Sequence, residues 1–114
     1  MLSDYEKYKR FISSSFTFDD FKSFTSDVLG EMHMIFVLVD NNEIVASATL
    51  LIEKKLNHNL SKMAHIEDVL VDSNSRGKGY GFMLIDYLLQ KSKRNECYRT
   101  ALQCNDDVIG FYQK

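Results

Sequence analysis

The chain has 114 residues, of which 45% are apolar and 26% charged, and its formal net charge is -2. This composition is ordinary for a single soluble domain spanning residues 1–114, and the charge argues against a nucleic-acid-binding surface. No basic segment precedes an apolar run at the N-terminus, and no apolar run is long enough to cross a bilayer. We therefore expect a cytoplasmic protein without a membrane span.

The N-terminal part of the sequence predicts two helices. Residues 4–15 have a weak helical pattern, and Thr17 and Asp20 have the spacing of a capping box. The helix that this box would open has its apolar side chains on one face, namely Phe21, Phe24, Val28 and Leu29. Gly30 is a natural C-cap for it.

The middle of the sequence predicts strands. Residues 35–40 and 43–53 are rich in β-branched side chains and flank Asn41-Asn42, which tolerates the positive φ values of a two-residue hairpin turn. A polar loop over residues 54–62 then leads into a strand at 65–72. The two strands that flank the turn are predicted to form an antiparallel pair.

A glycine-rich turn follows the apolar run Val69-Leu70-Val71 and opens an amphipathic helix. Its sequence is Arg76-Gly77-Lys78-Gly79-Tyr80-Gly81. Glycine permits crowded or left-handed backbone conformations, and a helix start directs unpaired N–H groups at an anion. The spacing is not that of a dinucleotide fingerprint, because position 82 is phenylalanine, and no GK[ST] ending is present for a P-loop. We predict a diphosphate cradle.

The C-terminal part predicts a strand at 98–104 and a helix that begins at Asn105-Asp106-Asp107. The element order is that of an α/β protein with a mixed sheet. Cys97 and Cys104 lack CxxC spacing and are expected to be buried structural thiols. No cluster of His, Cys and carboxylate residues has the spacing of a zinc site, so we expect no metal.

These motifs resemble the glucosamine 6-phosphate N-acetyltransferase family of the GNAT superfamily. The resemblance covers about residues 35–114 and rests on the Arg-x-x-Gly-x-Gly turn, the preceding strand His65-Ile66-Glu67-Asp68-Val69, Cys97-Tyr98 and Gly110-Phe111-Tyr112. It implies the GNAT fold, with a mixed sheet that opens like a V around acetyl-CoA. It also implies a homodimer that transfers the acetyl group directly to the amine of glucosamine 6-phosphate, toward UDP-N-acetylglucosamine.

The resemblance also implies roles for residues around the donor substrate. Main-chain groups of Val69, Leu70 and Val71 would align the pantetheine as an extra strand, and those from Arg76 to Gly81 would hold the diphosphate. Tyr112 and Lys114 would complete the acetyl-CoA site. Tyr112 is also the expected acid, because a phenol with a pKa near 10 can protonate a departing thiolate of similar basicity.

The acceptor side carries the other expected site residues. Glu67 is the expected base or water-orienting group, and Asp68 a ligand of the sugar amine or hydroxyls. Adjacent residues on a regular strand face opposite sides, so both reach one site only if the strand has a bulge. The sugar and its phosphate would be bound by a further set, partly from the neighbouring subunit: Lys55, His58, Tyr98, Arg99 and Gln103.

Other interpretations stay open. Glu67 and Asp68 have the alternative of a solvent-exposed strand end, and Tyr112 that of a core phenol. The family usually has an acid where this chain has Gln103 and an asparagine where it has Val108, and its members continue past Lys114. We therefore expect a GNAT fold shortened at both ends. The alternatives for function are a degenerate acyl-CoA-binding or dimerising module, or a GNAT enzyme for another amine.

Overall fold

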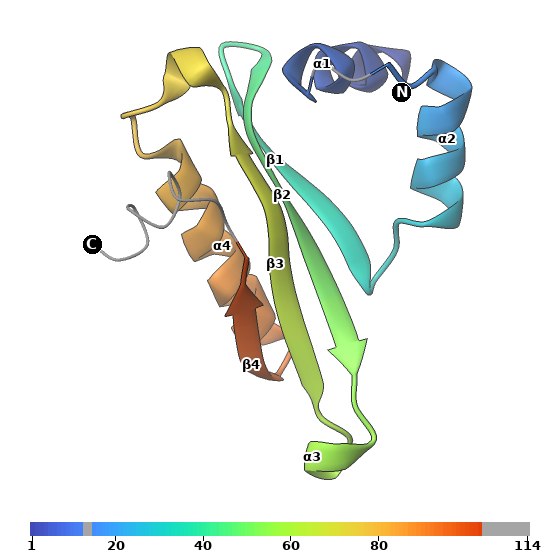
Figure 1. Ribbon diagram of the computed structural model, residues 1–114, viewed down its shortest axis with the longest axis vertical. Coiled ribbons are helices and arrows are strands. Elements are labelled where there is room, and N and C mark those ends of the chain that lie inside the picture. The colour runs from blue at the N-terminus through green and yellow to red at the C-terminus, as the bar shows by residue number, and fades with distance from the viewer. Residues whose placement is uncertain (13–14, 104–114) are drawn as a thin grey trace.

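The computed structural model describes residues 1–12 and 15–103 (Figure 1). Its sheet has the order β1-β2-β3-β4, with β1, β2 and β3 antiparallel and β4 parallel to β3. The predicted mixed α/β class is confirmed. The elements are α1 (Leu2–Ile12), α2 (Phe18–Asp27), β1 (His33–Asp40), β2 (Glu43–Lys54), α3 (Asn57–Leu60), β3 (Lys62–Val71), the 3-10 turn η1 (Ser73–Ser75), α4 (Tyr80–Arg94) and β4 (Cys97–Leu102).

The start of α2 is set by the predicted capping box. The Asp20 N–H donates to Thr17 Oγ1 at 3.1 Å, and the Thr17 N–H donates to Asp20 Oδ2 at 2.9 Å. The predicted end was wrong, because α2 stops at Asp27 and Val28 is its C-cap. Gly30 instead forms an isolated bridge with His33, so it belongs to the turn into β1.

The hairpin between β1 and β2 is confirmed. Asn41 and Asn42 have φ values of 53° and 64°, as a two-residue turn between twisted antiparallel strands requires. The turn places Asp40 opposite Glu43. It therefore fixes the position of both acidic side chains at one end of the sheet.

The polar segment 54–62 is more ordered than its composition predicts. It contains the one-turn helix α3, and β3 begins at Lys62 because Lys62 pairs with Lys54 across the ladder. The prediction of a loop over the whole of residues 54–62 was wrong for this reason. Pairing with β2 extends β3 into residues that carry no strand pattern of their own.

The hydrophobic core lies between α4 and one face of the sheet. Leu50, Ile66 and Leu88 are fully buried there, one each from β2, β3 and α4. The alternation of side chains along β2 puts Ala46, Ala48 and Leu50 on this face. The core therefore fixes the direction of α4 relative to β3, and with it the connection between them.

Helices α1 and α2 lie on the opposite side from α4 (Figure 1). A cavity of about 530 Å³ separates them from β1, which is an edge strand, and its walls are mainly apolar. Val37 and Val39 on β1 are 41% and 52% exposed and line this cavity. The helices thus cover this face of the sheet incompletely.

The predicted strand at 98–104 corresponds to β4, and Cys97 is half-buried against the core rather than fully buried. Burial raises the pKa of its thiol. Cys104, Val108, the predicted last helix, Tyr112 and Lys114 lie outside the described residues.

Candidate active site

The strand β3 is irregular at the two adjacent carboxylates. Ser47 of β2 pairs with Leu70 and Thr49 pairs with Glu67, so β3 has one residue more than β2 between these pairs. Asp68 has a φ of 53°, which is the left-handed region. The bulge that the sequence analysis required is therefore present. It breaks the strict alternation of faces and leaves Asp68 exposed and Glu67 half-buried.

Beyond the bulge, one edge of β3 has no strand partner in the part of the chain that the structure describes. The pairing with β4 ends at Ile66 and Leu102, and the Gln103 N–H then donates to the Ile66 carbonyl at 2.9 Å. On the other side, Leu70 and Val71 are still paired with β2. The main chain near Val69, Leu70 and Val71 can therefore bind an extended ligand on the β4 side.

The turn before α4 has the backbone expected of an anion site. Gly77 and Gly79 have φ values of 85° and 79°, and a Cβ at either position would meet nothing within 4 Å. Gly79 is the N-cap of α4, and no side chain caps the helix. The N–H groups of the first turn of α4 thus remain available to a ligand, together with the positive end of the helix dipole.

Contacts on both sides hold the start of α4. A Cβ at Gly81 would lie 3.2 Å from Val71 Cγ2, so the helix approaches the end of β3 closely. The Tyr80 hydroxyl donates to Asp40 Oδ2 at 2.5 Å. This hydrogen bond, together with burial, raises the pKa of the Tyr80 phenol above its ordinary value of 10.0. The phenol therefore stays protonated and continues to donate at neutral pH.

The expected ligands of the sugar phosphate lie at the other end of the sheet. Lys55 follows β2, and α3, which includes His58, lies beyond it (Figure 1). From Lys62, at the start of β3, to Glu67 the strand extends about 17 Å at 3.4 Å per residue. Lys55 Nζ instead lies 3.3 Å from Glu53 Oε1. Within one chain, Lys55 is thus far from Glu67 and Asp68.

The residues of β4, together with Gln103 directly after it, divide between the two ends of the sheet. Arg99 pairs with Met63, so Tyr98 and Arg99 lie near the start of β3, on the side of Lys55, and both are exposed. Gln103 lies beside Ile66, next to Glu67, and is exposed. The fold therefore gathers Glu67, Asp68, Gln103 and the glycine turn toward one end, and Lys55, Tyr98 and Arg99 toward the other.

Two polar contacts of this region were missed by sequence reasoning. Glu53 Oε1 lies 3.0 Å from His65 Nε2 as well as near Lys55, and these hydrogen bonds, the one from His65 first, lower the pKa of Glu53. The signal was the register of β2 against β3, since Leu51 pairs with His65 and Glu53 is two residues further along β2. The contact of Asp40 with Tyr80 had no local signal.

Among residues 1–12 and 15–103, no group of three or more His, Cys, Asp or Glu side chains is placed to hold a metal ion. The helices in this part of the chain include none long and apolar enough to span a membrane. The expectation that no metal takes part stays a prediction.

Comparison with known proteins assigns the chain to a family. The model of the acetyltransferase (GNAT) family matches residues 1–114. The glucosamine 6-phosphate N-acetyltransferase of Candida albicans is 39% identical over 71 residues, which are 62% of this chain and 48% of that protein. That of Arabidopsis thaliana is 38% identical over 87 residues, which are 75% of this chain and 58% of that protein.

A solved structure is similar to this chain as well. The crystal structure of glucosamine-6-phosphate N-acetyltransferase from Arabidopsis thaliana matches with a TM-score of 0.89 and 31% identity, over 99% of this chain and 84% of that chain. This chain spans about half the length of the curated relatives that it matches. The fold, the glycine turn and the match over the whole sequence agree, and the chain belongs to the GNAT acetyltransferase family.

Proposed function

We propose that this chain is an N-acetyltransferase that moves the acetyl group of acetyl-CoA to the amine of glucosamine 6-phosphate, in the biosynthesis of UDP-N-acetylglucosamine. One observation carries the proposal. The strand β3 carries the bulged pair Glu67 and Asp68, and its edge beyond them is not paired with β4. The glycine turn and the uncapped start of α4 follow this strand in the chain. An amine site and a thioester-and-diphosphate site are thus contiguous on one strand. The names of the relatives supply the acceptor.

The reaction is a direct aminolysis. The amine nitrogen attacks the thioester carbon, the N–C bond forms, and the C–S bond breaks as CoA leaves. Glu67 accepts the amine proton, directly or through a water molecule, and Tyr112 gives a proton to the thiolate. Asp68 holds the sugar amine or a hydroxyl group. Main-chain groups from Val69 to Val71 and from Arg76 to Gly81 orient the donor, which lowers the entropic part of the barrier.

The proposal includes a homodimer with shared active sites. Lys55, Tyr98 and Arg99 are expected to bind the sugar phosphate, yet they lie toward the opposite end of the sheet from Asp68 in the same chain. Two chains arranged around a twofold axis would bring these groups of one subunit to the carboxylates of the other. The position of α3, with His58, supports the same arrangement. The cytoplasmic location expected from the sequence stays a prediction.

The test is release of free CoA from acetyl-CoA with glucosamine 6-phosphate as acceptor. Glucosamine without the phosphate and a polyamine serve as comparison acceptors. We expect glucosamine 6-phosphate to give the highest kcat/KM, because cations reserved for its phosphate add binding energy that the other amines lack. Higher kcat/KM with the polyamine would instead assign the enzyme another amine.

A second candidate is a non-catalytic acyl-CoA-binding module. Gln103 favours it, because it stands where the family usually has an acid, and an amide holds a charged amine less firmly. Under our proposal, Gln103→Glu raises activity toward glucosamine 6-phosphate. If the wild type and Gln103→Glu both bind acetyl-CoA but release no CoA, the binding module is the better assignment.

A further inference from the structure

The hydrogen bond between Tyr80 and Asp40 joins two parts of the chain that are 40 residues apart. Tyr80 is the first residue of α4 and follows Gly79, whose backbone is left-handed. Its ring packs against the core, while its hydroxyl reaches the exposed carboxylate of Asp40 at the end of β1. The bond therefore links the hairpin to the first turn of the helix that follows the glycine turn.

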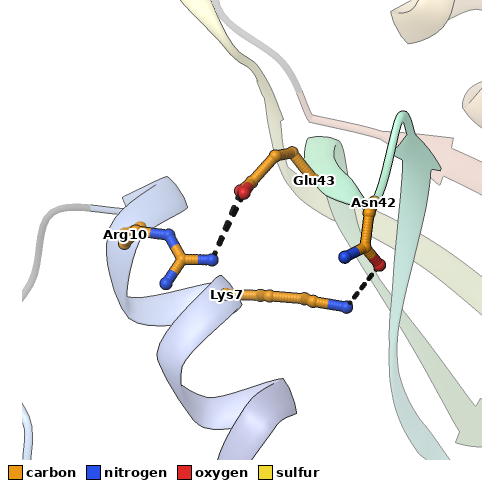
Figure 2. Close-up of polar contacts among 4 residues, drawn as sticks. All are labelled: Lys7, Arg10, Asn42 and Glu43. Atoms are coloured by element: carbon orange, nitrogen blue, oxygen red, sulfur yellow. Dashed lines mark hydrogen bonds and ion pairs between the residues drawn. The ribbon is translucent and has the colours of Figure 1, made fainter.

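The hairpin is itself held from its other side by α1. Lys7 Nζ donates to Asn42 Oδ1 at 2.9 Å, and Arg10 Nη2 lies 3.4 Å from a carboxylate oxygen of Glu43 (Figure 2). Asp40 is paired with Glu43 in the ladder. The backbone at Asp40 is thus an anchor whose position is set mainly by the strand pairing, with two exposed side-chain contacts from α1 beside it.

The glycine turn lies beside open space on this side. A cavity of about 420 Å³ lies between α1, the hairpin and the turn, with Arg10, Asp40 and Lys78 among its lining residues. Two glycines with positive φ make the turn intrinsically permissive, and no side chain caps α4. The Tyr80 side chain crosses from this permissive turn to the anchor at the cavity's edge. It adds a polar contact to the first helical turn, beside the close approach of Gly81 to Val71.

A carboxylate at this place opposes anion binding by its charge alone. Asp40 lies near the turn that is proposed to receive a diphosphate, and like charges repel. If Asp40 acted only through its charge, removing it would strengthen anion binding. If it acts through the Tyr80 hydroxyl, removing it would weaken binding. The two mechanisms therefore predict opposite signs for one substitution.

We infer that Asp40 is a positioning residue for the donor substrate. It holds the Tyr80 hydroxyl, and thereby the first turn of α4, so that the main-chain N–H groups of Tyr80 and Gly81 point at the diphosphate of acetyl-CoA. The inference rests on the proposed function, since it concerns the same donor site. Asp40 itself does not touch the substrate.

The experiment is a calorimetric measurement of the Kd for acetyl-CoA on the full chain. Tyr80→Phe and Asp40→Ala each weaken binding about five-fold, the size of one hydrogen bond. The double variant is weakened about five-fold as well, because both substitutions remove the same contact. Asp40→Asn keeps an acceptor oxygen and retains most of the affinity. In turnover assays, KM for acetyl-CoA rises while kcat stays unchanged.

The matched control is Tyr87→Phe. Tyr87 lies on the same helix, is 47% exposed and is remote from the glycine turn. Tyr87→Phe removes the same hydroxyl group and leaves the Kd for acetyl-CoA unchanged. Each variant is also melted without ligand, and the Kd is compared at a temperature where every variant is folded, so that a general loss of stability is separated from a loss of affinity.

Several results overturn the inference. Tighter binding in Asp40→Ala means that the carboxylate acts only by its charge. An unchanged Kd in Tyr80→Phe, or a double variant weakened by the product of the two single effects, means that the contact does not position the helix. These outcomes leave the proposed function intact. If the wild type does not bind acetyl-CoA, both the inference and the proposed function are wrong. If it binds acetyl-CoA but transfers no acetyl group to glucosamine 6-phosphate, only the proposed acceptor is wrong.

Discussion

Two residues with positive φ direct groups around the proposed acetyl-CoA site, and only one of them has a side chain. Gly79 adopts a φ of 79° without a Cβ to oppose it, which lets the turn pass directly into α4. Asp68 adopts a φ of 53° although it has a side chain, a conformation that aspartate tolerates better than most residues. Gly79 orients the main-chain N–H groups at the start of α4, and Asp68 turns its carboxylate away from the face that a regular strand would give it.

We predict that Gly79→Ala raises the Kd for acetyl-CoA about ten-fold, because the left-handed conformation costs an alanine about 1–2 kcal/mol. The added methyl group meets no neighbour within 4 Å, so steric overlap with other residues does not contribute. Calorimetry on the folded protein measures the effect. Gly30→Ala is the control, since its Cβ is equally free and the residue lies far from the turn. Equal affinity of the two variants would contradict the assignment of the turn.

Among the helices and strands, some boundaries are set by neighbouring residues and others by pairing with a distant strand. The start of α2 and the turn at Asn41 were predictable from the sequence, because a capping box and a two-residue turn are set by neighbouring residues. The start of β3 at Lys62 was not, because it depends on pairing with Lys54 in another strand. The contact of Asp40 with Tyr80 was unpredictable for the same reason.

The features of the candidate site also differ in how far the sequence alone predicts them. The glycine turn was predicted from its residues, whereas the bulge at Asp68 was expected only because the family resemblance placed both carboxylates at one site. No local pattern in β3 specifies which residue will be displaced. The separation of Lys55 from Glu67 depends on the extension of β3 back to Lys62, which pairing with β2 sets and the sequence did not predict.

The contacts of Glu53 lead to a prediction of pH dependence. Its pKa is lowered from the ordinary 4.5, chiefly by the hydrogen bond from His65. A carboxylate whose pKa is lower in the folded state stabilises the fold above its unfolded pKa, and this contribution is lost as the pH falls through the folded pKa. Glu53→Gln should therefore lower the melting temperature at pH 7, and the difference from wild type should shrink as the pH falls below 4.5 and disappear once the pH is below the lowered pKa of the folded state.

Thermal melts of both proteins between pH 7 and acid conditions measure this difference. Glu31→Gln is the control, because Glu31 is exposed and lies outside the helices and the four strands. A difference between wild type and Glu53→Gln that stays constant over the whole pH range would mean that Glu53 stabilises the fold through packing rather than through its charge.

At the scale of the whole molecule, the two ends of the sheet carry complementary chemistry. One end has carboxylates and main-chain donors, and the other has Lys55 and Arg99, which suit a phosphate. Separation by about half the length of β3 leaves each end incomplete for the proposed reaction. The proposed completion of each site by a second chain has a consequence that can be measured with mixed subunits.

We predict complementation between Lys55→Ala and Glu67→Gln. Each homodimer should be nearly inactive, because each lacks one group at both sites. A heterodimer purified with two affinity tags should regain about half of the wild-type activity, since one of its two sites then has both groups intact. If Lys55 served the site of its own chain, every site in the heterodimer would carry one defect, and no activity would return.

The cavity between α2 and β1 has a consequence for the heat capacity of unfolding. Unfolding a chain of 114 residues normally raises the heat capacity by about 1.4–1.7 kcal/mol/K, because water comes to surround apolar groups that were buried. The walls of this cavity, including Val37, Val39 and Phe24, are already partly hydrated in the folded chain. Differential scanning calorimetry of the single chain should therefore give a value below this range. A partner that covers these walls should raise it, and the temperature dependence of stability would then report their occupancy without any assay of acetyl transfer.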